Sequence, residues 1–458
     1  MSTAVTEAQQ QPSFWASIRE AVRGSHQDFT AGSLNRAILL LAIPMVLEMV
    51  LESLFAVVDV FWVGRVGANA VATVGLSESL MLLVFAIGMG LSLSTTAMVA
   101  RRIGEKDPED AAVAGVQAII LGLTVSVVIG VPALIYAPQL LGLMGASPEI
   151  VATGSGYARI ALGGSGVVLM LFLNNAIFRG AGDAAIAMRL LWVSNIINLI
   201  LDPCLIFGWG PFPRMGVTGA ALATFTGRGT ERIRVLRRQI RVNLEVIWRL
   251  FRVSLTGIFQ FMIAQTSWIG LVRIVSIFGA SALAGYTIAI RIVIFAILPS
   301  WGLSNAAATL VGQNLGAKQP ERAETSVWRT GLYNMIFLGS VGIVFILFAP
   351  QVVHIFTHDP AVVPLAVAAL RIVSVGNIGY AYAMVMLQAF NGAGDTITPT
   401  IVNFFGFWML EIPLAYWLAI HLGWRSNGVF WSIVVAEGSI AVASMFLFRR
   451  GKWKQRMI

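Results

Sequence analysis

The sequence is poor in charged residues, which make up 12% of its 458 positions, whereas soluble domains carry about 25%. This shortage excludes an ordinary soluble protein. The single cysteine, Cys204, excludes an intrachain disulfide and leaves no pair for redox chemistry. The first thirty residues are polar and lack the apolar core of a cleavable signal peptide. With 57% hydrophobic residues and a mean hydropathy of +0.80, the chain is predicted to be a polytopic helical membrane protein.

The net charge of +9 comes from Lys and Arg in alternate loops. The basic clusters lie at Arg101, Arg102 and Lys106; Arg179 and Arg189; Arg228–Arg252; Lys318, Arg322 and Arg329; and Arg449–Arg456. The loops between them hold few basic residues, and none lies in 137–156 or 350–370. Because basic residues remain on the cytoplasmic side, both termini are expected there. Nucleic acid is not expected as a partner.

Twelve apolar segments are expected to form spans. The first is Leu34–Arg65, and the others lie at 68–99, 111–136, 154–178, 184–208, 215–229, 250–278, 281–311, 326–349, 362–389, 396–420 and 428–448. The sixth is uncharged only over 215–227, and such a stretch covers about 20 Å of a hydrocarbon core of about 30 Å. Either this helix ends inside the membrane with its arginines reaching the interface, or the chain has lost a piece here, which would bring its full activity into question.

The two halves of the chain repeat each other at one constant offset, the spacing that separates Gly180 from Gly392. At this offset the motif Gly180-Ala181-Gly182-Asp183 recurs as Gly392-Ala393-Gly394-Asp395, and Gly104, Lys106 and Pro108 recur as Gly316, Lys318 and Pro320. Six spans in each half is an even number, so both halves enter the membrane in the same direction. Parallel repeats of this kind place a substrate site between the halves, near the middle of the bilayer.

The first segment carries three acids in an otherwise apolar helix, namely Glu48, Glu52 and Asp59. All three project from one face, within about 40° of Glu48 and over roughly 16 Å of helix. Acids inside a membrane helix face a cavity or a partner and mark an ion path by default. The alternative is that a single acid pairs with a buried Arg or caps a backbone group. Pro44 removes a backbone hydrogen bond in this helix, so a bend or hinge is expected beside it.

The fifth segment carries a second polar face. Asn195, Asn198 and Asp202 lie within about 60° of each other at helical spacing. They form a candidate ion site, although such side chains can instead bond only to neighbouring helices. For Asn195 we favour that second interpretation. No Ser-His-Asp, Cys-His or metal-binding set falls at membrane depth, so neither an enzyme nor a bound cofactor is expected.

Several motifs in combination resemble the multidrug and toxic compound extrusion (MATE) family. They are AIPM at Ala42–Met45, VDVFWVGRVG from Val58, FRGAGD from Phe178 and NLILDPCLIFG at Asn198–Gly208. The resemblance extends from Leu34 to Arg450. It implies an all-α fold of twelve spans in two parallel six-helix lobes that alternate between outward-open and inward-open forms. It also implies an antiporter that expels cationic, amphiphilic compounds as protons or sodium ions enter.

The resemblance extends to individual residues of the proton-coupled, archaeal and DinF-like branch. There, the cation site joins an aspartate of the first helix, an asparagine and an aspartate of the fifth, and an asparagine of the fourth. Those positions resemble Asp59, Asn198, Asp202 and Asn175, and Pro44 resembles the proline at which the first helix bends. A proton is expected as the coupling ion. Sodium at Asp59 and Asp202 is the alternative, since carboxylates and amides supply oxygens for a hard cation.

Departures from the family pattern concern the second half. Other branches place essential carboxylates on the seventh and tenth helices, whereas this chain has Gln265 on the seventh and no acid in 362–389. A second ion site is therefore not expected. Glu411 and Glu437 are either substrate contacts or satisfied structural groups. The candidates for a substrate cavity, whose negative charge would suit cations, are Glu48, Glu52, Glu78, Gln265 and Glu411.

The predicted organisation is a cytoplasmic tail (1–33), an N-terminal lobe (34–229), a basic cytoplasmic linker (230–249), a C-terminal lobe (250–450) and a basic tail (451–458). We expect a multi-pass monomer of the inner membrane, in contact with lipid, that exports small organic cations or amphiphiles. One alternative is a flippase for lipids or lipid-linked oligosaccharides, whose basic cavity would contrast with the acids here. Another is a non-transporting membrane receptor or scaffold.

Overall fold

The computed structural model describes residues 14–24, 28–66, 68–228 and 242–456. In this part of the chain the regular structure is helical throughout, without strands. The helices of the first half are α1 (Phe14–Arg23), α2 (Leu34–Gly64), α3 (Ala68–Gly104), α4 (Pro108–Leu143), α5 (Pro148–Gly163), α6 (Ser165–Ala181), α7 (Ala184–Phe207) and α8 (Val217–Arg228). Those of the second half are α9 (Leu244–Ser276), α10 (Ala280–Gly316), α11 (Pro320–His354), α12 (Val363–Val375), α13 (Asn377–Gly392), α14 (Ile397–Asn403), α15 (Ile412–Tyr416) and α16 (Ser426–Arg449), with π-helical turns at Phe404–Glu411 and Trp417–His421 and a 3-10 turn at Lys452–Gln455.

Most of these helices are long and apolar enough to cross a membrane. Among the described residues ten such spans occur, and α12 and α13 together form an eleventh that is bent by 53°. On the outer face of α4, Val127, Val128 and Val131 are more than half exposed, as lipid-facing side chains are. The predicted all-α, polytopic fold is therefore confirmed. The short sixth span is α8, with 12 residues, and the basic segment 229–241 lies outside the described residues.

The backbone confirms the internal repeat through irregular features that the sequence motifs do not reveal. Lys106 and Lys318, which correspond to each other in the repeat, both have positive φ angles, 62° and 58°. The kink of α4 at Tyr136 recurs in α11 at Phe348. The break between α5 and α6 at Gly164 likewise recurs between α12 and α13 at Gly376. The two halves therefore share irregular features of the backbone as well as their helices.

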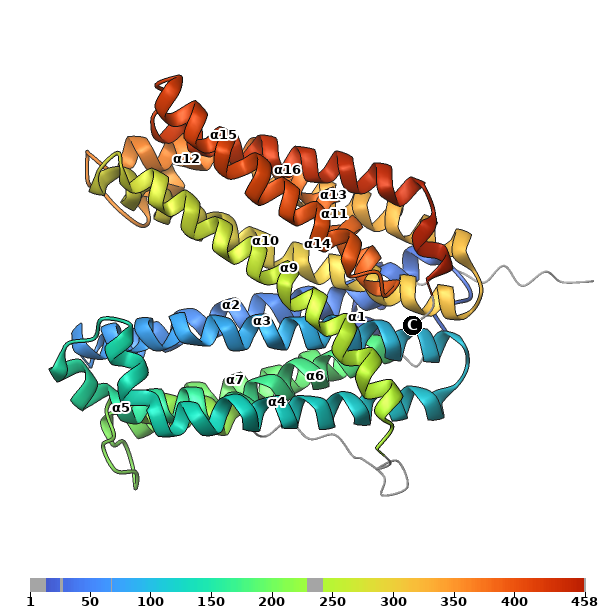
Figure 1. Cartoon of the computed structure of the whole chain (residues 1–458), viewed down its shortest axis with the longest axis horizontal. Coiled ribbons are helices and arrows are strands. Elements are labelled where there is room, and N and C mark those ends of the chain that lie inside the picture. The colour runs from blue at the N-terminus through green and yellow to red at the C-terminus, as the bar shows by residue number, and fades with distance from the viewer. Residues whose placement is uncertain (1–13, 25–27, 67, 229–241, 457–458) are drawn as a thin grey trace, which may run out of the picture.

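The two halves form two bundles that meet at one end of the molecule and diverge towards the other (Figure 1). The C-terminus and α1 lie at the end where the bundles meet. There α3 packs against α9 and α10, and α2 packs against α10. This arrangement places the contact between the halves near the ends of α3 and α10.

The first spanning helix of each half begins against the opposite half. The start of α2 contributes Leu41 and Met45 to a core that includes Ala306 and Leu310 of α10. In the same way α9 places Leu250 in the core of the first half and Leu271 in the core of the second. α9 begins at Leu244, within the range predicted as a linker. Each half is thus tied to the other by a helix that crosses between them.

Glycine allows the closest approach between the halves. A Cβ added to Gly104 would lie 2.0 Å from the carbonyl oxygen of Gln313, and one added to Gly316 would lie 2.1 Å from that of Arg101. Gln313 and Arg101 are themselves equivalent positions of the repeat. The contact is therefore reciprocal, with each glycine set against the same position of the other half.

Candidate functional site

The first cluster of buried polar groups lies on α7 and α8. Asp202 and Asn198 are 0% and 1% exposed. With the Asn198 amide oriented so that its nitrogen donates to Asp202 Oδ2 at 2.9 Å, its oxygen accepts from the backbone N–H of Thr224 at 3.1 Å and from the Thr224 hydroxyl at 3.2 Å. Asn198 is thus held from α8 while it donates to the carboxylate. Thr224 was not among the residues predicted for this site, because a single hydroxyl in the short sixth span does not by itself indicate a contact with Asn198.

Asp59 lies in α2, but its side chain is outside the described residues. The level of its backbone follows from two contacts between α2 and α7. The Asn195 amide donates to the Leu51 carbonyl at 3.3 Å, and the rings of Trp62 and Phe207 lie 6.0 Å apart. Leu51 and Trp62 are eleven residues apart on α2, and Asn195 and Phe207 are twelve residues apart on α7. Along the helix axes, the backbone of position 59 therefore lies within one turn of the level of Asp202. Asn195 thus bonds to the neighbouring helix, as the interpretation favoured for it expects.

A second buried cluster surrounds Glu48. Its Oε1 accepts from Asn175 Nδ2 at 3.1 Å and lies 3.4 Å from Arg179 Nη1. Arg179 Nη2 also donates to the Ser92 hydroxyl at 3.2 Å. Asn175, expected beside Asp202, therefore donates to Glu48 in this structure. The pairing of Glu48 with a buried arginine is the alternative that the sequence had left open for a single acid.

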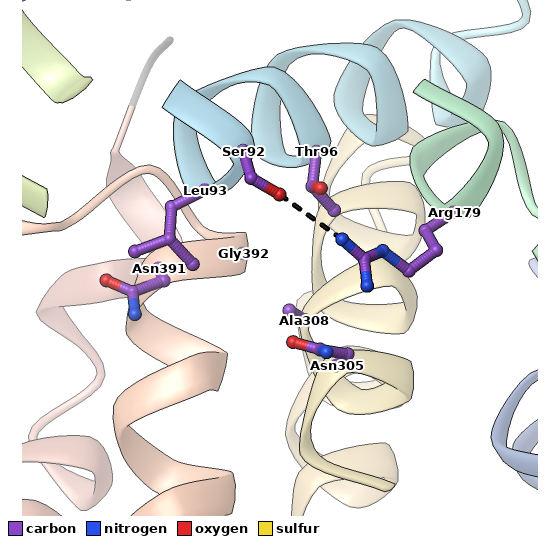
Figure 2. Close-up of a pocket in the computed structure, with 8 residues that line it drawn as sticks. All are labelled: Ser92, Leu93, Thr96, Arg179, Asn305, Ala308, Asn391 and Gly392. Atoms are coloured by element: carbon purple, nitrogen blue, oxygen red, sulfur yellow. Dashed lines mark hydrogen bonds between the residues drawn. The ribbon is translucent and has the colours of Figure 1, made fainter. Parts of the chain in front are cut away.

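Arg179 also lines a small polar cavity between the halves (Figure 2). The cavity has a volume of about 20 Å³, and its lining residues are Ser92, Leu93, Thr96, Arg179, Asn305, Ala308, Asn391 and Gly392. A space of this size holds about one water molecule. Arg179 and Asn391 are related by the repeat offset, so the cavity lies where the equivalent parts of the two halves face each other. In the sequence, Arg179 is recognisable only as one of the basic residues expected in a loop.

The remaining candidates for a substrate cavity are dispersed. Glu52 is half-buried on α2, whereas Glu78 on α3 and Gln265 on α9 are exposed. Glu78 interacts electrostatically with Arg291 of α10, across the divide between the halves. Glu411 is only 2% exposed, and its Oε2 accepts from Ser267 at 2.8 Å. The structure thus places Glu411 inside the second half, with a hydroxyl donor on one of its carboxylate oxygens.

None of these clusters has the composition of a conventional metal centre. Within the described ranges no group of three or more His, Cys, Asp or Glu side chains could hold a metal ion. Buried carboxylates supported by amides and a hydroxyl, in a bundle of apolar spans, are typical of ion-coupled membrane transport. Two parallel helical repeats that meet at one end also define a secondary-transporter architecture.

The comparisons with known proteins agree with this class. The family model described as MatE matches residues 44–204 and matches again at 257–417. The two matches have the same length and fall on equivalent parts of the two halves, as the repeat requires. The chain belongs to the MatE family, whose members are membrane transporters.

Individual relatives cover nearly the whole chain. A probable multidrug resistance protein NorM of Thermotoga maritima is 26% identical over 437 residues, which cover 93% of this chain and 94% of the relative. A solved structure described as the outward-facing conformation of a multidrug resistance MATE family transporter of the MOP superfamily is 26% identical, with a TM-score of 0.85 over 94% of this chain and 97% of that one. A MOP superfamily transporter from Pyrococcus furiosus, also 26% identical, has a TM-score of 0.84 over 96% and 99%. It is described as having a binding pocket of reverse polarity that suggests a different function.

Proposed function

We propose that this chain is a secondary antiporter that exports cationic or amphiphilic organic compounds in exchange for protons, by alternating access. The observation that carries the proposal is the complete burial of Asp202 and its partner Asn198 on α7, level with position 59 of α2. The multidrug resistance relatives support the class of substrate. The lobes are proposed to comprise residues 34–229 and 250–450, linked by the crossing helices α2 and α9.

The proposed mechanism follows from the cost of burying charge. A carboxylate surrounded by protein and lipid is unfavourable unless a proton or a cation neutralises it. Binding of a proton at Asp202 and Asp59 would remove the charge that attracts a cationic substrate. The outer part of α2 could then repack about Pro44, so that proton entry and substrate exit exclude one another. α2 runs as one helix through Pro44 here, and the hinge stays a prediction.

The membrane setting is proposed on the same basis. Basic residues gather in alternate loops, and therefore at one end of the spans, which supports cytoplasmic termini and an inner-membrane location. We propose a monomer surrounded by lipid. Sodium is the alternative coupling ion, held by the carboxylate oxygens of Asp59 and Asp202. The amide oxygens of Asn198 and Asn175 would join them only after these side chains turn from Thr224 and Glu48.

The test is transport by the purified protein in proteoliposomes, with a proton gradient or a sodium gradient imposed separately. The wild-type chain is expected to move a fluorescent organic cation when the proton gradient is present. Asp202→Asn keeps the volume and removes the charge, so it should fold and lose gradient-driven transport. Glu411→Gln is the matched control, because it alters an equally buried acid that Ser267 satisfies. Normal transport by Asp202→Asn, or lipid translocation without drug efflux, would overturn the proposal.

Thr224 gives a finer test of the same site. Thr224→Val removes the hydroxyl that Asn198 accepts from, while the backbone N–H of the same residue remains. Loss of one neutral hydrogen bond weakens the hold on Asn198 by about 1 kcal/mol. Transport should therefore fall severalfold and keep its dependence on the proton gradient. A transport rate equal to that of the wild-type chain would show that the Thr224 hydroxyl does not contribute to the coupling site.

A further inference from the structure

Residues 28–33, here named the strap, run across the end of the molecule where the halves meet. The strap follows α1 and leads into α2, whose first turns pack against α10. Phe29 is 4% exposed and lies against Gly182 in the turn between α6 and α7. The strap therefore leads into a helix that packs on the second half and contacts a turn of the first.

Arg322 fixes the strap to the second half. From the first turn of α11, its guanidinium donates to the carbonyl oxygens of Phe29, Ala31 and Gly32 at 3.3, 3.0 and 3.1 Å. Further along α11, Arg329 Nη1 donates to Asn35 Oδ1 at 2.8 Å. Three charge-assisted bonds from one guanidinium define both the position and the shape of this short segment.

Lys106 holds the strap from the first half. Its ammonium group forms an ion pair with Asp28, whose carboxylate also accepts from the backbone and hydroxyl of Thr30. Lys106 lies in the turn between α3 and α4, two positions after Gly104, which touches Gln313 of α10. Gln313 Nε2 in turn donates to the carbonyl of Gly180 at 3.0 Å. The strap thus adds a polar tie beside the tightest contact between the halves.

The strap is anchored at these points and is not packed against the protein along its whole length. Strap residues line an open pocket of about 300 Å³ together with both halves, through Asp28, Thr30, Lys106 and Gln313. Opening this end of the molecule must separate Lys106 and Gly182 from Arg322. Because the strap contacts both sides, it would have to release one of them.

We propose that the strap is a latch that holds this end of the transporter closed and sets the share of molecules open at the proposed cytoplasmic side. The proposal rests on the alternating access proposed above. Breaking either anchor should favour the state in which this end is open, without altering the buried polar clusters around Asp202 and Glu48.

The test measures how often the contact between the halves opens. Ser94 is 0% exposed, and its hydroxyl lies 2.6 Å from that of Ser254 across the contact between α3 and α9. With Cys204→Ser as background, Ser94→Cys supplies one thiol that reacts only when this contact opens. Its labelling rate in detergent is compared among strap variants, and melting temperature checks that each variant is folded.

Arg322→Gln removes charge-assisted bonds and should raise the labelling rate about tenfold or more. Asp28→Asn breaks only an exposed ion pair and should raise it by about two- to fivefold. Lys318→Gln is the matched control, because Lys318 has the same backbone conformation as Lys106 but no side-chain hydrogen bond or ion pair with any described residue. The exchange Asp28→Lys with Lys106→Asp restores the charge pair but not the hydrogen bonds from Thr30, which lysine cannot accept. It should therefore label more slowly than Asp28→Lys alone, since aspartate tolerates the positive φ at position 106, but faster than the wild-type chain.

Labelling of folded Asp28→Asn and Arg322→Gln at the wild-type rate would overturn the latch. So would equal acceleration by Lys318→Gln. The measurement does not depend on transport. If the proposed function is wrong, the wild-type chain fails to move substrate in proteoliposomes whether or not the labelling pattern holds.

Discussion

Arg179 of α6 and Glu48 of α2 form a buried ion pair, with Nη1 3.4 Å from Oε1 and side-chain exposures of 9% and 2%. The pair joins the inner part of α2 to the helix that lines the small cavity between the halves. A buried ion pair contributes little net stability, because desolvation offsets most of the attraction. Removal of one partner is costly, because the remaining charge is left without compensation.

The two single variants of this pair should differ in stability. Glu48→Gln leaves a guanidinium that cannot lose its charge, and a cost of about 3–5 kcal/mol is expected. Arg179→Met leaves a carboxylate that can take up a proton, so its cost should be smaller. Melting temperatures in detergent measure both. The double variant Glu48→Met with Arg179→Met should recover much of the loss, and additive losses would show that the pair is not coupled.

The sequence predicts features that depend on neighbouring residues better than contacts between residues far apart in the chain. The spans and the repeat follow from local apolar stretches and one constant offset, and both are confirmed. The shared face of Glu48, Glu52 and Asp59 is also a local property of one helix. The partner of Glu48 is not local, since Arg179 lies 131 residues away on another helix.

The same limit applies to the contacts between the halves. An internal repeat implies two similar lobes, but it cannot show that α2 and α9 begin against the opposite lobe. In the sequence, Arg322 is only one of several basic residues in a turn expected on the cytoplasmic side. Its bonds to the carbonyls of 29, 31 and 32 depend on backbone positions 290 or more residues away, which no pattern of side chains reveals.

Gly104 should be intolerant of even one added carbon. In Gly104→Ala the new Cβ would lie 2.0 Å from the Gln313 carbonyl oxygen, so α3 and α10 must separate. Overpacking of this kind costs about 1–3 kcal/mol. We expect a lower melting temperature and faster labelling of Ser94→Cys. Gly75→Ala, in the same helix with nothing within 4 Å, is the control, and an equal effect of both would refute the role of the close contact.

The membrane topology can be checked at two pairs of repeat-related turns. Reporter fusions at Lys106 and Lys318 are both expected to report the cytoplasm, because these turns carry the basic residues. Fusions near Ser147 and Asp359, which lie in the connections at the other end, should both report the outside. Opposite results for the two members of either pair would contradict the parallel orientation of the halves.

The strap should not respond to pH in the range where transport is measured. Burial tends to raise the pKa of Asp28, but the hydrogen bonds from Lys106 and Thr30 outweigh it and hold the pKa at about 2, below the ordinary value of 3.8. A carboxylate with a lowered pKa contributes its stabilisation fully above its unfolded pKa and loses it as pH falls towards the folded value.

The ion pair of the strap is therefore complete from pH 5 to pH 8. The ratio of labelling rates between Asp28→Asn and wild type should be constant over this range and should fall towards one only below about pH 4. Any pH dependence of efflux between pH 5 and pH 8 must then arise elsewhere in the protein. Asp28→Asn should therefore change the rate of efflux at every pH in this range and leave the midpoint of the pH profile where it is in the wild-type chain. A midpoint that moves in Asp28→Asn would show that the strap takes part in the proton-coupled step itself.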